Sequence, residues 1–219
     1  MVNGNQFLQL FKPMKKVGII DYEMGNINSI INSLKYLGFD YKVTNLKEEI
    51  DQLPMLILPG VGSFKTAMLN IKRLKLFDEL KNQAIIKKKK ILGICLGMQI
   101  LGSSSTEDGF TDGLNFIENK VTKFEFENST TIRVPHIGFN NISYLTKNFS
   151  LFKNINLKDN FYFVHSYKMN LQNNTNYALC NYGTDFLAAF QKENIFGVQF
   201  HPEKSQSSGI QLLNNFLNI

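Results

Sequence analysis

The chain has 219 residues, 43% of them hydrophobic, which is enough to form one sizeable core and predicts one domain rather than two. Its net charge of +6 would suit a nucleic-acid binder, but the lysines are scattered and no aromatic and basic residues alternate, which argues against that class. No apolar run is long enough to cross a bilayer, no secretory signal pattern is present and only two cysteines occur, so we expect a cytoplasmic protein without disulfides.

The opening "MVNGNQFLQLFKPMKK" contains apolar residues, but they are too few and too scattered for a secretory segment. We interpret residues 1–14 as an N-terminal extension that is disordered or precedes the natural start, for which Met14 is a candidate. Residues 15–219 then form the single domain.

The first half alternates apolar runs with helical periodicity. "KVGIID" predicts a strand, and the spacing of apolar residues in "GNINSIINSLKYLGF" predicts a helix after it. "YKVTN", "PMLILPG" and "KILGI" predict further strands, and "KTAMLNIKRLKLFDELKNQAIIKKKK" predicts one or two amphipathic helices. This order predicts an α/β, flavodoxin-like fold, with a mostly parallel central sheet flanked by helices and a ligand at the carboxyl ends of the strands.

Lys87 to Lys90 is the one run of like charge. Such a run is typical of a solvated helix end, which the helix dipole favours at a C-terminus. We therefore expect it to be solvated surface.

The second half is β-rich. Short strands are predicted by "KVTKFEFEN", "TTIRVP", "NFYFVHSY", "NYALCNYG", "DFLAAFQ" and "IFGVQF". "NYGTD" predicts a hairpin turn, and "SGIQLLNNFLNI" predicts a closing amphipathic helix.

Cys95 lies in "GICLG", which fits the glycine-X-nucleophile-X-glycine pattern of a strand-to-helix elbow. At a helix N-terminus, unpaired N–H groups and the helix dipole stabilise a thiolate, the reactive form. The alternative is that Cys95 is a small buried hydrophobe, which is how we interpret Cys180 in "YALCNY".

A nucleophilic cysteine needs a base, and the histidines are His136, His165 and His201. His201 follows an apolar strand in "FGVQFHPEKS", and Glu203 is close enough in sequence to orient its ring. His-Pro-Glu could equally be only a turn.

A bound metal is a weaker alternative, because the histidines are 29 and 36 residues apart and no Cys-X-X-Cys or His-X-X-X-His spacing occurs. "LPGVGSF" is glycine-rich and follows a strand, but it lacks the spacing of the phosphate-binding motifs. Its backbone N–H groups could equally stabilise an oxyanion. We expect neither a metal nor a cofactor.

Together, "LPGVGSF", "GICLGMQ" and "FGVQFHPEKS" resemble the triad-type, class I glutamine amidotransferases with a Cys-His-Glu site. "IDYEMGNINS", "VPHIGFN" and "YFVHSY" look like signatures of the glutaminase subunit of imidazole glycerol phosphate synthase, from histidine biosynthesis. The first of these motifs begins at residue 20 and the last ends at residue 205, so the resemblance covers almost the whole expected domain.

The resemblance implies an enzyme that hydrolyses L-glutamine to glutamate and ammonia. Cys95 would attack the carboxamide carbon, His201 would pass a proton to the leaving ammonia, and Glu203 would hold His201. The N–H of Leu96 and one near Val61 and Gly62 would bind the oxyanion. The glutamine pocket would be lined by Gly60, Gly62, Gln99, His165, Ser166 and Tyr167.

The resemblance also implies a heterodimer in which ammonia is channelled to a (β/α)₈-barrel cyclase subunit. That partner makes imidazole glycerol phosphate and an aminoimidazole carboxamide ribotide. Asn26, Phe139 and Lys204 would face it, although each could equally be a surface or packing residue.

The chain departs from the family pattern in the partner-facing motifs. Glu23 replaces the glycine of "DYGMGN", and "VPHIGFN" replaces "PHMGWN"; "GLNFIENKV" also lacks the glycine of "GLGLIPGKV". The second half also resembles a paralogous group of surface-polysaccharide gene clusters, whose partner makes an acetamidino sugar. A silent scaffold or regulatory subunit is a further alternative, against which the intact triad argues. In the related small peptidases a histidine follows the cysteine directly, where this chain has Leu96.

Overall fold

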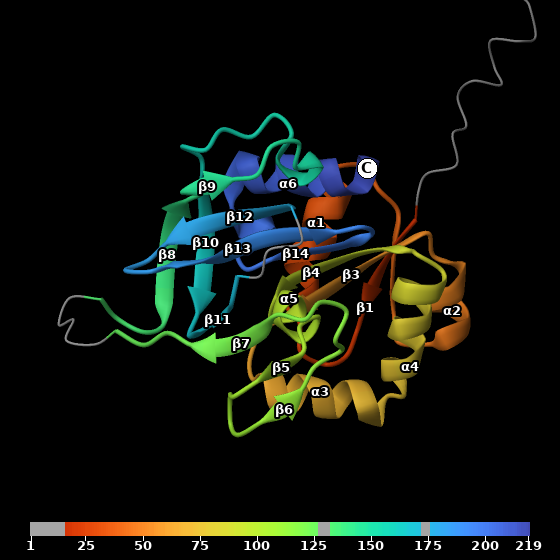
Figure 1. Ribbon diagram of the computed structural model, residues 1–219. Coiled ribbons are helices and arrows are strands. Elements are labelled where there is room, and N and C mark those ends of the chain that lie inside the picture. Colours follow the sequence, from red (N-terminus) through yellow and green to blue (C-terminus); the bar gives the residue numbers. More distant parts are fainter. Residues whose placement is uncertain (1–15, 127–131, 172–175) are drawn as a thin grey trace, which may run out of the picture.

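The computed structural model describes residues 16–126, 132–171 and 176–219, so the extension expected at residues 1–14 lies outside the described residues. One eight-stranded sheet runs through the molecule in the order β2-β1-β3-β4-β14-β13-β12-β9 (Figure 1). Its strands are β1 (Val17–Ile20), β2 (Tyr41–Thr44), β3 (Met55–Gly60), β4 (Lys90–Cys95), β9 (Tyr144–Leu145), β12 (Asn176–Asn181), β13 (Asp185–Lys192) and β14 (Ile195–Val198).

The sheet is parallel from β2 to β14 and antiparallel from β14 to β9. The predicted flavodoxin-like, mostly parallel sheet is therefore confirmed for the first half of the chain. The pairing of β4 with β14 joins the two halves, with Ile94 opposite Val198. Because the two strands run in the same direction, Cys95, the last residue of β4, and Gln199, the residue after β14, lie at the same edge of the sheet.

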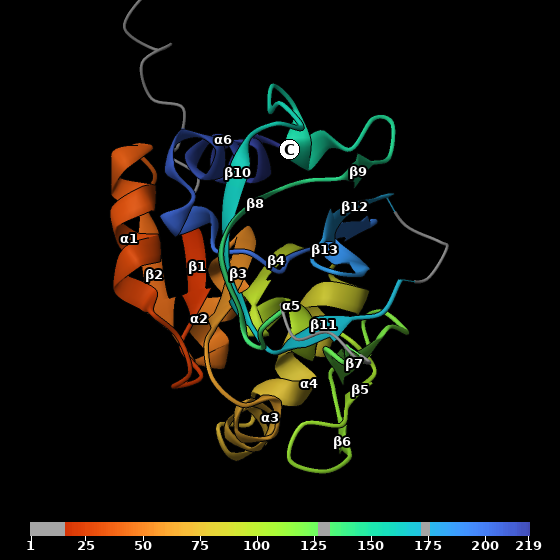
Figure 2. The same cartoon turned by 90° about the vertical axis from the view of Figure 1, so that its left-hand side faces the viewer.

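Helices cover both faces of this sheet, with α6 (Gln206–Asn218) above it and α3 (Phe64–Arg73) below it in Figures 1 and 2. α6 shares its apolar core with α1 (Ile27–Tyr36). The other face is covered by α3 together with α2 (Lys47–Gln52), α4 (Leu76–Lys81) and α5 (Leu96–Ile100).

Local sequence explains the bounds of the predicted helices. α1 buries Ile30 and Leu34, four residues apart on one face, and it stops before Gly38, whose φ of 73° is a left-handed conformation that suits glycine. α3 begins after Ser63, whose hydroxyl accepts a hydrogen bond from the N–H of Thr66 at 3.5 Å. The second of the two predicted helices is α4, which continues into a π-helical turn, η1 (Asn82–Ile86).

The second half adds two smaller sheets, of order β10-β8 and β11-β7-β5-β6. Their strands are β5 (Ser104–Ser105), β6 (Thr111–Asp112), β7 (Lys120–Lys123), β8 (His136–Asn141), β10 (Asn160–His165) and β11 (Tyr167–Met169). Short 3₁₀ turns are η2 (Ser150–Phe152) and η3 (Pro202–Lys204). The hairpin predicted at "NYGTD" is confirmed, since β12 and β13 pair antiparallel on either side of Gly183, with φ of 71°.

The strand predicted at "TTIRVP" is wrong for its described residues, 132–135, which form no strand; the two threonines lie outside the described residues. The strand β8 begins at His136, immediately after Pro135. Proline has no N–H to give to a ladder, which explains why pairing starts only beyond it.

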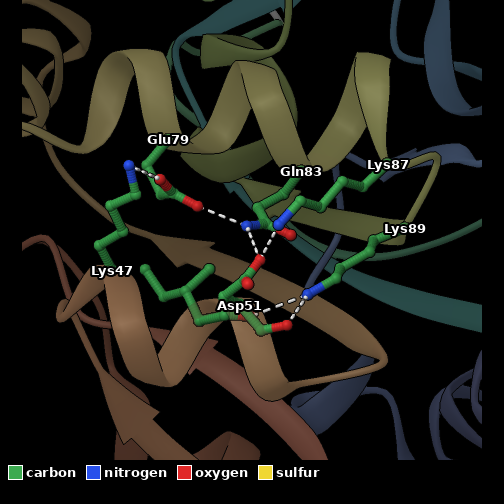
Figure 3. Close-up of polar contacts among 7 residues, drawn as sticks. Lys47, Asp51, Glu79, Gln83, Lys87 and Lys89 are labelled. Carbon is green, nitrogen blue, oxygen red and sulfur yellow. Dashed lines mark hydrogen bonds and ion pairs between the residues drawn. The ribbon is translucent and has the colours of Figure 1, made fainter.

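The lysine run follows η1, as predicted, but its side chains are paired rather than only solvated. Lys87 forms an ion pair with Asp51, and Lys88 Nζ lies 2.8 Å from a carboxylate oxygen of Glu193. Lys89 Nζ donates to the carbonyl of Asp51 at 2.6 Å, near the C-terminus of α2, where a cation is favoured (Figure 3). Lys90 donates to the carbonyl of Ile219.

Gln83 lies at the centre of the same polar cluster, which ties α2 to α4 and η1 (Figure 3). Its side chain is fully buried and donates to Asp51 Oδ1 at 2.9 Å and to Glu79. The hydrogen bonds from Gln83 and Lys87 lower the pKa of Asp51 to about 2. The cluster is structural and contains none of the predicted site residues.

Across the described ranges, no helix is both long enough and apolar enough to cross a membrane.

Candidate active site

Cys95 ends β4 and immediately precedes α5, with φ of 55° and ψ of −111°. Residues other than glycine rarely adopt a positive φ, and such strain is typical of functional sites. The flanking glycines permit the turn: a Cβ on Gly97 would lie 1.8 Å from the Leu58 carbonyl oxygen, and one on Gly93 would lie 2.6 Å from that of Gly97. The predicted strand-to-helix elbow is therefore confirmed.

His201 and Glu203 form a buried pair beyond the end of β14. Nδ1 of His201 lies 2.8 Å from Oε1 of Glu203, and the side chains are 3% and 2% exposed. Burial alone would lower the pKa of His201, but its contacts with Cys95 and Glu203 outweigh that effect and raise the pKa to about 10. Nε2 of the His201 ring has no hydrogen-bond partner among the described residues. The structure thus brings the three predicted triad residues together.

Gln199 was not singled out in the sequence, although it lies within "FGVQFHPEKS". Its side chain is fully buried, and its Nε2 lies 3.7 Å from Sγ of Cys95. Its Oε1 accepts a hydrogen bond from Gln99 Nε2 at 3.0 Å, and the same nitrogen donates to the carbonyl of Tyr167 at 2.9 Å. The contact between Gln199 and Cys95 depends on the pairing of β14 with β4, so the sequence pattern alone did not indicate it.

A pocket of about 370 Å³ opens over Cys95. One wall comes from the first half of the chain, with Val61, Gly62, Leu96 and Gln99. The other wall comes from the second half, with His165, Ser166 and Tyr167. Gly60 is not among the lining residues: it lies behind the wall, where a Cβ would meet the hydroxyl of Tyr22 at 2.2 Å.

Glu107 also lines the pocket, and no pattern in "SSSTEDG" indicated it. Its Oε2 accepts a hydrogen bond from the N–H of Phe64 at 2.7 Å, which fixes the carboxylate at the start of α3. Burial raises the pKa of Glu107, and the bond from Phe64 opposes that rise. The pocket therefore presents one oriented carboxylate several residues away in sequence from every predicted site residue.

The predicted oxyanion donors differ in their availability. Leu96 is the first residue of α5, where the backbone N–H has no intrahelical acceptor. The N–H of Val61, however, donates to the carbonyl of Met24 at 2.6 Å. One predicted donor is thus engaged outside the pocket in this conformation. Gly62, with φ of 102°, gives the loop the freedom to reorient.

His165 and His136 form a hydrogen-bonded chain beneath the pocket. His165 Nδ1 donates to the Tyr167 carbonyl at 2.8 Å, so its Nε2 is the acceptor for His136 Nδ1 at 3.1 Å. His136 Nε2 then accepts from Asn140 Nδ2 at 3.0 Å. Burial lowers the pKa of His165 to about 3 and that of His136 to about 4, so both rings are neutral. With both nitrogens engaged, the His165 ring supports the pocket wall and has no free polar atom for a ligand.

The three residues predicted to face a partner are all exposed. The ring centroid of Phe139 lies 5.3 Å from that of Tyr162, and Nζ of Lys204 lies 5.7 Å from the centre of the same ring. Phe139 and Lys204 are therefore brought to one patch by Tyr162, whereas Asn26 is the exposed residue that precedes α1. Within the described residues, no group of three or more histidine, cysteine or acidic side chains is placed to hold a metal.

Comparison with known proteins agrees with this geometry. Residues 18–219 match the family "Glutamine amidotransferase class-I". The chain is 41% identical to the imidazole glycerol phosphate synthase subunit HisH 1 of Campylobacter jejuni strain RM1221, over 93% of this chain and 100% of that protein. It is 44% identical to HisH 2 of Methanococcus maripaludis, over 92% and 98%.

Solved structures share the fold at lower identity. PurLQS from Thermotoga maritima superposes with a TM-score of 0.70 at 20% identity, covering 94% of this chain and 98% of that one. The chain therefore belongs to the class-I glutamine amidotransferase family, in which it is similar to the HisH subunits of imidazole glycerol phosphate synthase.

Proposed function

We propose that this chain is the glutaminase subunit of an imidazole glycerol phosphate synthase. It hydrolyses L-glutamine and delivers the ammonia to a (β/α)₈-barrel cyclase subunit in histidine biosynthesis. The observation that carries the proposal is the strained Cys95 at the base of a pocket, coupled to the buried His201–Glu203 pair. The identity to HisH subunits of 41% and 44% across nearly their whole length supports the pathway.

Glutamine is recognised by its charged end and by its amide. Glu107 is the acidic group that pairs with the α-ammonium, because its carboxylate lines the pocket and is already held by the N–H of Phe64. Gln99 has both amide hydrogens engaged, so its remaining polar atom, Oε1, accepts from a substrate N–H. Ser166 and Tyr167 complete the opposite wall.

The reaction begins with the thiolate of Cys95, which attacks the carboxamide carbon. The charge that develops on the oxygen is met by the N–H of Leu96 and, after the loop reorients, by that of Val61. The imidazolium of His201 gives its proton to the leaving ammonia, and a glutamyl thioester forms. The neutral ring then takes a proton from water, which cleaves the thioester to glutamate and regenerates the thiolate–imidazolium pair.

The cyclase docks on the patch formed by β8 and η3. Ile137 and Phe139, two residues apart on β8, are 59% and 47% exposed, and Lys204 lies beside them over Tyr162. An apolar centre with a charged rim is an ordinary interface arrangement. Asn26, which precedes α1, also faces the cyclase. We place this chemistry in the cytoplasm, where the free thiol of Cys95 stays reduced.

A second candidate function keeps the glutaminase chemistry and changes the recipient of the ammonia. The relatives from several organisms are numbered HisH 1 or HisH 2, so more than one such subunit is named there. In this chain Glu23, in a partner-facing motif, has φ of 64° and pairs with Arg73 on α3. The alternative recipient of the ammonia is a barrel partner that amidinates a surface sugar. Co-purification followed by synthesis with each barrel subunit distinguishes the two.

Labelling with a glutamine-analogue electrophile tests the proposed nucleophile in the complex with the cyclase. We expect the label on Cys95, read by peptide mass spectrometry. Cys180 is the internal control, because it is buried and its pKa is raised to about 12. If the protein hydrolyses glutamine while Cys95 stays unlabelled, the proposed mechanism is wrong. If neither occurs with any barrel partner, the chain is a silent subunit.

A further inference from the structure

The sulfur of Cys95 has a polar environment that the triad alone does not describe. Sγ is 4.0 Å from the carbonyl of Val164, which can only accept, and 3.7 Å from Gln199 Nε2, which can only donate. Gln199 has no exposed surface, so its amide must find its partners inside the protein. Its place in the fold is fixed, because it follows Val198, the partner of Ile94 in the β14–β4 ladder.

A backbone carbonyl decides which end of the Gln199 amide faces the sulfur. The Tyr167 carbonyl is an acceptor, so the Gln99 atom 2.9 Å away must be its nitrogen. The second hydrogen of that nitrogen points to the Gln199 atom at 3.0 Å, which must therefore be an oxygen. The NH₂ end of Gln199 is then left to face Sγ of Cys95.

The opposite orientation of these amides would create two conflicts. A flipped Gln99 would place oxygen against the Tyr167 carbonyl. That carbonyl also accepts a hydrogen bond from His165 Nδ1 at 2.8 Å, and it has no hydrogen to give to a second oxygen. A flipped Gln199 would place its NH₂ against the NH₂ of Gln99 and its oxygen against the sulfur. Buried polar groups left unpaired in this way are costly, so one polarity is selected.

We propose that Gln199 is a positioning residue of the glutaminase site: its NH₂ group donates a hydrogen bond to the sulfur of Cys95, while its oxygen fixes the orientation of the Gln99 amide. The inference rests on the proposed function and deepens it. A donor at the sulfur favours the thiolate over the thiol. The fixed Gln99 amide leaves an oxygen, rather than an NH₂ group, to meet the substrate. One side chain thus links the nucleophile to the recognition of glutamine.

The Gln199→Met substitution keeps a side chain of similar size and removes both the donor and the acceptor. In the full chain, the rate of Cys95 alkylation by iodoacetamide is measured against pH from the Cys95 peptide. We expect the pH midpoint to rise by about 1 pH unit, because a hydrogen bond to the charged form is lost. In the complex with the cyclase, we expect kcat for glutamine hydrolysis to fall by about tenfold and KM to rise.

Gln83→Met is the matched control. Gln83 is equally buried and its side chain also forms two hydrogen bonds, but it donates both of them within the polar cluster of Figure 3. This substitution is expected to lower stability while leaving the alkylation midpoint and kcat unchanged. If Gln199→Met lowers stability and leaves the midpoint unmoved, as the control does, the role of Gln199 is only structural and the proposal is overturned.

A measurement on the unsubstituted protein avoids the risk that Gln199→Met does not fold. The side-chain NH₂ resonances of Gln199 should shift with pH at the same midpoint as Cys95 alkylation, and they should stay constant in Cys95→Ala. Resonances that do not follow the titration would overturn the proposal. The alkylation midpoint and the NH₂ resonances both report on the sulfur of Cys95, so they remain informative if glutaminase activity is absent. Failure of the proposed function and failure of this inference are therefore distinguishable.

Discussion

The Glu203→Gln substitution measures how strongly a buried carboxylate holds His201 in its charged form. The amide has the same shape and keeps an oxygen for the Nδ1–H, so only the negative charge is lost. The contact is 2.8 Å between nearly inaccessible side chains, where water screens little. The pKa of His201 rises from 6.5 to about 10, which corresponds to about 5 kcal/mol in favour of the imidazolium.

Cys95 and Glu203 both contribute to this stabilisation, and an equal share for Glu203 corresponds to roughly 2 pH units. The active form carries the imidazolium, so activity is lost as pH rises through the pKa. We expect the alkaline limb of kcat/KM to move from near pH 10 to about pH 8 in Glu203→Gln, with the limb reporting the coupled cysteine–histidine pair. Glutamate release by the complex is assayed from pH 6 upward. A limb that stays near pH 10 would refute the electrostatic role of Glu203.

Three further predictions concern the loop that contains Val61, the left-handed backbone conformation of Glu23 and the neutral side chains of His165 and His136. The N–H of Val61 donates to the carbonyl of Met24, so it cannot bind the oxyanion in this loop conformation. The free subunit should therefore hydrolyse glutamine about 10²–10³ times more slowly than the complex, which is the usual loss for one oxyanion donor. Equal rates for the free subunit and the complex would contradict this prediction. The Glu23→Gly substitution relieves about 1 kcal/mol of strain from the left-handed backbone conformation and removes an exposed ion pair worth about 0–1 kcal/mol. The Tm of the protein should therefore stay level or rise by a few degrees. A clear fall in Tm would contradict this prediction. The pKa values of His165 and His136 in the folded protein lie below the unfolded value of 6.5, so the stability that these neutral rings contribute is present above pH 6.5 and is lost as pH falls towards about 4. The free energy of unfolding in urea should therefore fall over this pH range, and it should fall less in His136→Gln. A free energy of unfolding that does not change with pH would contradict this prediction.

The grouping of Cys95, His201 and Glu203 could be predicted from the sequence because its signals are local. The glycines two residues on either side of Cys95 are what the elbow requires, since a Cβ on either would meet backbone. Glu203 is two residues from His201, and the 3₁₀ turn that starts at Pro202 brings its carboxylate back to Nδ1. Neither inference needed knowledge of which strands are neighbours.

The supporting residues could not be predicted because they depend on strand register and on contacts between distant segments. Gln199 reaches the sulfur only because β14 lies in parallel beside β4, more than a hundred residues earlier in the chain. Glu107 reaches the pocket because the start of α3 holds it. The hydrogen bond from Val61 to Met24 joins two loops that are distant in the sequence, and local sequence patterns do not predict such a contact.

Two further differences from the sequence-based expectations, at "TTIRVP" and in the lysine run, have the same origin. "TTIRVP" has the β-branched composition of a strand, but Pro135 delays pairing until His136. The lysine run has the composition of solvated surface, yet Lys89 reaches the carbonyls that end α2, a contact fixed by how η1 packs against that helix (Figure 3).

Synthesis by the complex of the Cys95→Ala variant with the cyclase tests whether Cys95 is the nucleophile that releases ammonia from glutamine. The product, imidazole glycerol phosphate, is measured once with glutamine and once with added ammonium as the nitrogen source. We expect that glutamine-dependent synthesis is abolished, while ammonia-dependent synthesis stays near the rate of the unsubstituted complex. Loss of both activities would show that Cys95 is a structural residue, and retention of glutamine-dependent synthesis would show that it is not the nucleophile.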